Sequence, residues 1–360
     1  MSHLFSPLAL RGLELPNRIV VSPMCQYNSR DGDANDWHLM HLGQFCMGAA
    51  GLVITEATHV SPAGRITPHC LGLYSDSNEA SIGRVVAFCR QWGVSKLGIQ
   101  LAHAGRKGSA HRPLDGAKPL TAAEGAWPTL APSALPFGAD WHTPQAMTRA
   151  QMEQVKQEFV SATQRAARIG FDLVELHIGH GYLLHQFLSP LSNRREDQFG
   201  GSLENRLRFP LEVFSAVRAV WPDNRPLGIR VSATDWIDGG WTPEDTVSFV
   251  RRLKALGCDF ADVTTGGVDP RQQVPFAPGY NVPFAKKVKT EVGIPVMAVG
   301  MITRPRQAED IVAGGAADMV AIARGMMDDP RWAWRAAREL GATADYPKNY
   351  ARCQPPGFKY

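Results

Sequence analysis

The sequence has few of the features that place a protein in a membrane or on a nucleic acid. No uninterrupted apolar run approaches the ~20 residues that a membrane helix needs, and the N-terminus lacks a basic stretch followed by an apolar one. Lysine and arginine are scattered, and the formal net charge is only +4, which disfavours nucleic-acid binding. We therefore expect a cytoplasmic protein that binds neither membranes nor nucleic acids.

Cysteine is also scarce, and the spacing of the cysteines does not indicate a disulfide framework. The six cysteines form no C-x-x-C pair and lie at Cys25, Cys46, Cys70, Cys89, Cys258 and Cys353. With no secretion signal, this pattern favours free thiols in a reducing compartment over disulfides. The 44% hydrophobic and 20% charged residues are ordinary for a globular enzyme with a large core, so disorder is disfavoured.

Eight short apolar runs recur along the chain, most of them separated by stretches of helical periodicity. Continuous apolar runs, unlike alternating ones, indicate strands buried on both faces of a parallel sheet. The runs span 18–24, 51–57, 97–103, 171–177, 227–233, 260–266, 295–301 and 318–324. Eight such repeats predict an α/β protein: one closed (β/α)8 barrel domain, a TIM barrel, over residues 1–360.

Helix signals between the runs support the barrel. Thr148 and Gln151 have the spacing of a capping box before a periodic stretch that ends at Gly170, and a similar pattern from cap to glycine spans 242–257. A doubly wound open sheet has the same alternation of elements. It usually carries a G-x-G-x-x-G turn after its first strand, however, and SPMCQYNSRDG has none.

The segment 107–145 is rich in Pro, Gly and Ala, has little periodicity and is long for a loop. It follows the third run at its C-terminal end, which is the active-site end of such barrels. We expect it to be an extended loop or lid and not a linker between domains.

Polar side chains gather in the C-terminal parts of the runs and just after them, at the end where a barrel forms its active site. They are Cys25, Gln26, Tyr27, Glu56, Thr58, Gln100, His103, His177, His180, Tyr182, Arg230, Thr264, Thr265 and Arg324. After the last two runs, Gly300 and Gly325 would allow a phosphate to approach the backbone, and Arg324 could bind it. Alternatively, these glycines are ordinary turn residues.

The stretch HIGHGY puts His177 and His180 three residues apart and Tyr182 two further on. The histidines could be core residues, zinc ligands of a hydrolase, or hydrogen-bond donors to a substrate oxygen. Zinc is disfavoured because no Cys, Asp or Glu follows before Glu196, and the setting differs from a helical H-E-x-x-H. Two histidines at one strand end suit the polarisation of a carbonyl, with Tyr182 near enough to deliver a proton.

Six motifs occur in order over nearly the whole chain: SPMCQY (22–27), VITEATHVSPAGRITP (53–68), GIQLAHAGRK (98–107), FDLVELHIGHGYLLHQFLSPLSNRREDQFGGSLENRLRF (171–209), IRVSATDW (229–236) and AVGMIT (298–303). Together they resemble the old yellow enzyme family of FMN-dependent ene-reductases, more narrowly its thermophilic-like branch. The resemblance implies non-covalent FMN at the barrel mouth and NADPH or NADH as reductant. The implied substrates are α,β-unsaturated aldehydes and ketones, which receive hydride at the β-carbon, and nitro compounds. A flavin-binding sensor or scaffold is the alternative.

The resemblance also implies roles for individual residues. The implied FMN contacts are Ser22, Pro23, Met24, Cys25, Ala57, Gln100, Arg230, Gly300, Met301, Ala323 and Arg324, the last four at the phosphate. His177 and His180 would hold the substrate oxygen, Tyr182 would protonate the α-carbon, and Tyr27 would line the substrate pocket. Cys25 would adjust the flavin potential; its alternative role is a small buried hydrophobe.

Two further features of the chain bear on the resemblance, one a departure from it and one an extension of it. Ala323 stands where the family often has glycine, but alanine keeps its backbone N–H, so phosphate binding should survive. The C-terminal residues 343–360 resemble a tail whose arginine, here Arg352, reaches the active site of a neighbouring subunit. This implies a homodimer or homotetramer, and a frayed basic tail is the alternative.

Overall fold

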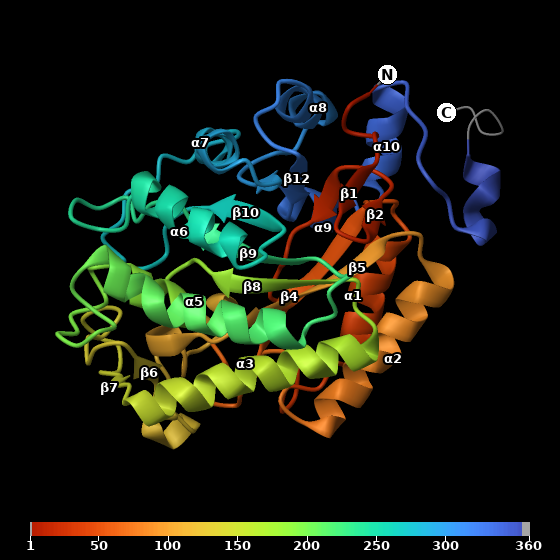
Figure 1. The fold of residues 1–360 in the computed structure, drawn as a ribbon. Helices are drawn as coiled ribbons and strands as arrows, with labels where there is room; N and C mark the ends of the chain where they lie inside the picture. Colours follow the sequence, from red (N-terminus) through yellow and green to blue (C-terminus); the bar gives the residue numbers. More distant parts are fainter. Residues whose placement is uncertain (1, 355–360) are drawn as a thin grey trace.

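Eight parallel strands close on themselves in the computed structural model, which describes residues 2–354 (Figure 1). They are β3 Ile19–Val21, β4 Leu52–His59, β5 Lys96–Ala102, β8 Leu173–Ile178, β9 Leu227–Ser232, β10 Phe260–Thr264, β11 Val296–Ala298 and β12 Met319–Ile322. β12 pairs in parallel with β3 and completes the ring. Each predicted run forms one of these strands, so the predicted single-domain barrel is confirmed.

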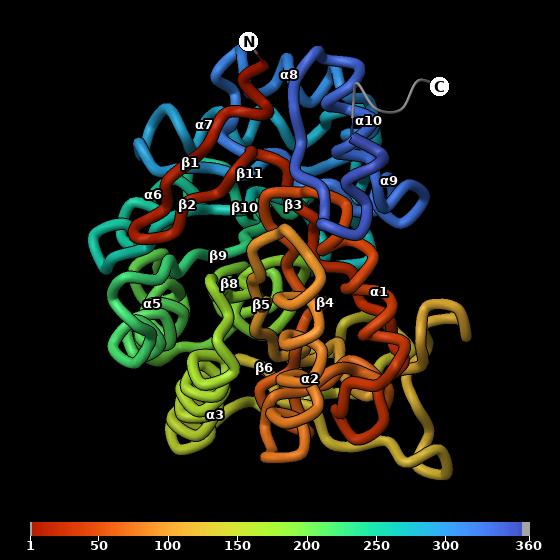
Figure 2. The backbone as a smooth tube through the Cα atoms, turned by 90° about the vertical axis from the view of Figure 1, so that its right-hand side faces the viewer, coloured from red at the N-terminus to blue at the C-terminus, as the bar shows by residue number. Residues whose placement is uncertain are grey.

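Helices surround the strands (Figure 2). They are α1 Asp36–Cys46, α2 Asp76–Trp92, α3 Arg149–Ile169, α4 Leu183–Leu188, α5 Leu203–Val220, α6 Pro243–Ala255, α7 Val282–Val292, α8 Pro305–Ala313, α9 Arg324–Asp328 and α10 Trp332–Glu339. Thr148 caps α3 in the predicted box with Gln151, and Gly170 ends the helix at φ +92. Among residues 2–354, no helix has the length and apolar character needed to cross a membrane.

The inside of the barrel is apolar where the strands begin. Its floor is one buried cluster that includes Val20, Leu52, Ile54, Leu173, Phe260, Met297 and Met319. An N-terminal hairpin of β1 (Leu8–Leu10) and β2 (Leu13–Leu15) packs its leucines into the same cluster. The sequence analysis did not predict this hairpin. Because hydrocarbon fills this end, the polar groups of the interior are confined to the other.

Two strands are shorter at the mouth than the apolar runs suggested. β3 ends at Val21 and β11 at Ala298, although their runs extend to 24 and 301. Pro23 has no N–H for a strand ladder, and Gly300 and Met301 have φ of +118 and +50, which no strand accommodates. These residues therefore leave the sheet and line the mouth.

The segment 107–145 contains only short elements. They are the end of η1 (Gly105–Lys107), η2 (Pro113–Asp115), η3 (Ala122–Glu124), and the parallel pair β6 (Leu130–Ala131) and β7 (Gln145–Ala146). The buried Arg106 side chain donates to the carbonyl oxygens of Leu135 and Pro136, each at 3.2 Å. The segment is therefore fastened to the barrel beside the end of β5.

Candidate active site

β8 carries His177 to the barrel mouth, and the turn that follows carries His180. Nε2 of His177 lies 3.2 Å from Nδ1 of His180, and Nε2 of His180 lies 3.0 Å from the Thr264 hydroxyl at the end of β10. His180 has the left-handed φ of +53, and its N–H donates to Ser232 Oγ at 2.9 Å. The turn is therefore fixed by β9 and β10, so that the two imidazoles face each other.

Both imidazoles are neutral in this setting. Burial, and then the charge of Arg230, lower the pKa of His177 and of His180 well below the usual value. A neutral imidazole carries one N–H. When the Thr264 hydroxyl donates to Nε2 of His180, the proton of that ring resides on Nδ1, which is the atom that faces His177.

A zinc site at this pair would need further ligands. Within residues 2–354, no three His, Cys, Asp or Glu side chains gather in a group that could hold a metal ion.

Tyr182, Tyr27 and Cys25 pack together beside the histidines, against a small buried cluster that includes Cys70. The Tyr182 ring lies edge-on to His177, with centroids 5.1 Å apart. Burial, followed by the neighbouring Cys25, raises the pKa of both phenols above their usual range. Burial and the charge of Glu56 raise the pKa of the Cys25 thiol in the same way. All three groups therefore keep their protons at neutral pH.

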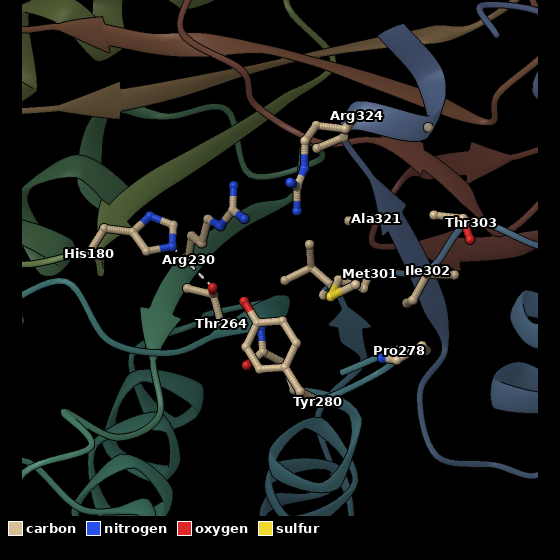
Figure 3. Close-up of a pocket in the computed structure, with 15 residues that line it drawn as sticks. His180, Arg230, Thr264, Pro278, Tyr280, Met301, Ile302, Thr303, Ala321 and Arg324 are labelled. Carbon is tan, nitrogen blue, oxygen red and sulfur yellow. Dashed lines mark hydrogen bonds between the residues drawn. The ribbon is translucent and has the colours of Figure 1, made fainter. Parts of the chain in front are cut away.

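A cavity of about 450 Å³ opens beside His180 (Figure 3), within the usual size range of ligand sites. It is lined by His180, Arg230, Thr264, Pro278, Tyr280, Asn281, Val299, Gly300, Met301, Ile302, Thr303, Ala321, Ala323, Arg324 and Gly325. The guanidinium groups of Arg230 and Arg324 both point into it (Figure 3). Since no carboxylate occurs among these described lining residues, the cavity suits an anionic ligand.

A buried polar layer lies next to the cavity inside the barrel. Gln100 Nε2 donates to Glu175 Oε1 at 2.8 Å. Arg230 Nε lies 3.1 Å from Asp262 Oδ2, and its Nη1 donates to Ser22 Oγ at 3.2 Å. The sequence analysis missed Glu175 and Asp262, which lie in the middle of apolar strand runs. An acidic residue inside such a run was the available signal, because it is seldom fully buried without a partner.

One arginine therefore faces two buried carboxyl groups. Burial and the charge of Asp262 raise the pKa of Glu175 to about 8, and Arg230 and Gln100 only partly oppose this. Burial also raises the pKa of Asp262, which Arg230 opposes. At neutral pH, Glu175 holds a proton, and Arg230 pairs with Asp262.

The structure brings most of the predicted site residues to one place. Ala57 pairs in register with Gln100, and Pro23 and Met24 connect Ser22 to Cys25. Around the cavity, His180 and Arg230 lie with the predicted phosphate set, Gly300, Met301, Ala323 and Arg324.

Arg352 is the exception among the predicted residues. It is exposed on η4 (Lys348–Cys353). The segment after α10 lies on the right of Figure 1, whereas β8 runs toward the left, to its C-terminal end at the mouth. Residues 355–360 of the expected tail lie outside the described residues.

Comparison with known proteins gives agreement over nearly the whole chain. Residues 3–342 match the model of the family described as NADH:flavin oxidoreductase / NADH oxidase. An NADPH dehydrogenase of Geobacillus thermodenitrificans is 44% identical over 351 residues, which cover 97% of this chain and 98% of that protein. An NADPH dehydrogenase of Listeria innocua is 42% identical over 354 residues, which cover 98% of this chain and 99% of that protein. The structure of morphinone reductase in complex with tetrahydroNAD has a TM-score of 0.78 at 27% identity, covering 96% of this chain and 92% of that one.

These findings confirm the resemblance to the old yellow enzyme family, and with it an oxidoreductase that uses FMN and a nicotinamide reductant. The residues present fit FMN. The cavity has the right size and carries two guanidinium groups for an anion. The buried Asn281 Nδ2 has no hydrogen-bond partner among the described residues, and it lies 3.0 Å from the position that a Cβ on Gly300 would take. A larger residue than glycine at position 300 would therefore crowd Asn281 in the wall of the cavity.

Replacing Glu175 with glutamine should change how stability depends on pH. Folding raises the pKa of this carboxyl from 4.5 to about 8, so the folded chain keeps a proton that the unfolded chain releases between these values. The free energy of unfolding of the wild type therefore falls with rising pH in this window, by up to about 1.4 kcal/mol per pH unit. The glutamine variant lacks this fall.

Urea denaturation at a fixed FMN concentration, at about pH 5.5 and about pH 7.5, measures the effect. Glu14→Gln, at an exposed position in β2, is the matched control. A difference between Glu175→Gln and the wild type that stays constant with pH would contradict a proton on Glu175.

Proposed function

The chain belongs to the NADH:flavin oxidoreductase / NADH oxidase family, and we propose that it is an NAD(P)H-dependent ene-reductase for small α,β-unsaturated aldehydes and ketones, and for nitro compounds. When bound, FMN would supply the redox chemistry, which is the transfer of hydride from NAD(P)H to the β-carbon of the substrate. The observation that carries the proposal is the pair of neutral, facing imidazoles, His177 and His180, beside a phenol that keeps its proton.

The histidines bind and polarise the substrate oxygen. An oxygen that enters between Nε2 of His177 and Nδ1 of His180 can accept the N–H of His180, and it can accept that of His177 when this ring takes the tautomer with its proton on Nε2, in place of their contact at 3.2 Å. Because the rings are neutral and buried, their N–H groups stabilise the negative charge that develops on this oxygen without giving up their protons. Thr264 keeps the proton of His180 on the atom that needs it.

Tyr182 delivers the proton. Its phenol is too weak an acid in this buried position to ionise at neutral pH, but a carbanionic α-carbon is a far stronger base and can take the proton. Tyr27 lines the same pocket from the opposite segment and packs with Tyr182 and Cys25. The loop 107–145 covers this pocket as a lid.

The cofactor would be held at two ends. Ser22, Pro23, Met24, Cys25, Ala57, Gln100 and Arg230 would contact the flavin ring. Gly300, Met301, Ala323 and Arg324 would hold the phosphate. The positions of Arg230 on β9 and Arg324 at the start of α9, which point into one cavity, support this assignment (Figure 3).

Mixing experiments on the FMN-loaded enzyme test the proposed activity. Anaerobic NADPH should bleach the flavin absorbance, and added cyclohexenone should restore it, because the site passes hydride from one to the other. Tyr182→Phe should slow only the second step, by roughly 10²–10⁴-fold, the usual range for a general acid. Equal slowing of both steps would contradict the proton-donor role, and a protein that binds no flavin would refute the activity.

Arg324→Gln should weaken FMN binding about 10- to 100-fold, because a charge-assisted hydrogen bond contributes about 1.5–3 kcal/mol. Fluorescence titration of the apoprotein measures the affinity. The affinity for riboflavin, which has no phosphate, should stay unchanged, and so should FMN binding by the control Arg251→Gln on α6. If riboflavin and FMN were weakened alike, Arg324 would not be the phosphate ligand.

We also propose a cytoplasmic homodimer or homotetramer in which Arg352 reaches a neighbouring copy. The exposure of Arg352 supports this, as does the position of η4, whose Asn349 and Tyr350 lie beside Met47 and Trp92 at the ends of α1 and α2. Six free cysteines suit a reducing compartment. Sedimentation should give a multiple of 39.4 kDa, and Arg352→Ala should weaken the binding of enones. A monomeric enzyme with unchanged enone affinity would contradict the proposal.

A further inference from the structure

Lys107, at the end of η1, contacts three other parts of the barrel mouth and has no part in the function proposed so far. Its Nζ donates to the carbonyl oxygens of His180 at 2.8 Å and of Gly267 at 2.9 Å. The same ammonium lies 4.7 Å from the ring centroid of Phe137 and 5.2 Å from that of Tyr182. It therefore contacts the lid, the turn after β8 and the loop after β10 at once.

The two turns that Lys107 bridges lie back to back. A Cβ on Gly181 would be 2.1 Å from the carbonyl oxygen of Gly267, and a Cβ on Gly267 would be 2.4 Å from the carbonyl carbon of His180. Both glycines have positive φ, +71 and +100. Two carbonyl groups thus converge on one point, where an ammonium with its three N–H donors can satisfy both.

Lys107 is a partly buried cation without an acidic partner. Within residues 2–354, no carboxylate pairs with it, so carbonyl dipoles and ring faces alone hold the charge. Withdrawing such a charge from water has a cost. A methionine would avoid this cost but would leave the carbonyl oxygens of His180 and Gly267 without their donor, and only a cation can act on charge at the Tyr182 ring.

We propose that Lys107 is the positioning residue for Tyr182: it fixes the turn that carries the phenol and stabilises the phenolate that forms when Tyr182 gives its proton to the substrate. This inference rests on the proposed role of Tyr182. In that step, the O–H bond of Tyr182 breaks and its electron pair stays on oxygen, while a C–H bond forms at the α-carbon. The ammonium offsets the new negative charge until a proton from solvent restores the phenol.

The charge of Lys107 is sensitive to pH in the working range of an enzyme. Burial, and then the adjacent Arg106, lower the pKa of Lys107 to about 8. The other titratable groups around it are the neutral His177 and His180 and the Tyr182 phenol. On the loop after β10, Asp269 pairs with Arg271. Stabilisation of the phenolate should therefore be present below about pH 8 and lost above it.

Lys107→Met and Lys107→Arg test this on the FMN-loaded enzyme. At about pH 7, the methionine variant should be oxidised by cyclohexenone about tenfold more slowly, as expected for loss of a charge near a forming anion. Its reduction by NADPH should change by less than about twofold, because that step needs no proton from Tyr182. In the wild type, oxidation by cyclohexenone should slow above about pH 8. This alkaline fall should vanish in Lys107→Met and move to higher pH in Lys107→Arg, whose guanidinium stays charged.

Arg106→Met is the matched control for a purely structural role. Arg106 is the other cation of η1, and it holds the same loops through the carbonyl oxygens of Leu135, Pro136 and Val268. No contact between Arg106 and the Tyr182 ring occurs among the cation–ring contacts of the described residues. This variant should lose thermal stability as Lys107→Met does, yet keep the alkaline fall, moved to higher pH because Arg106 no longer lowers the pKa of Lys107. The proposal is overturned if Lys107→Met keeps that fall or Arg106→Met loses it.

The double variant Tyr182→Phe with Lys107→Met separates the two proposals. If Lys107 acts through the phenol, the double variant should be oxidised by cyclohexenone no more slowly than Tyr182→Phe alone. A further tenfold slowing would overturn the role of Lys107 and leave that of Tyr182 intact. If Tyr182→Phe alone has no effect on this step, the proton-donor role of Tyr182 fails instead.

Discussion

The buried guanidinium of Arg230 is the group on which the rest of the mouth depends. It pairs with Asp262 at 3.1 Å, donates to Ser22 and points into the cavity. Burial is the main reason that the pKa of both histidines is lowered, and the charge of Arg230 adds to it; the same charge partly opposes the raised pKa of Glu175. In a water-poor interior, one fixed cation acts strongly on all its neighbours. Burial and Arg230 together keep the imidazoles at the mouth neutral.

The barrel makes this arrangement possible because it separates an apolar end from a polar one. The hairpin β1–β2 and the first residues of the strands close the floor with hydrocarbon. Polar side chains therefore gather only where the parallel strands end, and strands distant in sequence bring them into contact. The cations also differ in position: Arg230 and Arg324 point into the cavity, while Arg106 and Lys107 fasten the segment 107–145 and the turns beside it.

Much of this could be predicted from the sequence. Every strand of the barrel appears as an apolar run, because a strand covered on both faces needs few polar residues. Thr148 and Gly170 mark the ends of α3 because capping is a local interaction. The histidines, Tyr182 and Arg230 were found at strand ends. The sequence analysis missed Glu175 and Asp262 because they lie within strands. It also missed Lys107, which ends the motif GIQLAHAGRK, because this motif was used only to identify the family.

The sequence by itself determined the barrel, the family and the chemical groups at the mouth, since these follow from local patterns and from motifs. Only the tertiary structure decided which of these groups carry charge. A pKa depends on burial and on neighbours brought close by folding, as when Arg230 of β9 acts on His177 of β8 and Asp262 of β10 acts on Glu175. Neither effect can be read from the residues adjacent in sequence, because the interacting side chains meet only when the eight strands close.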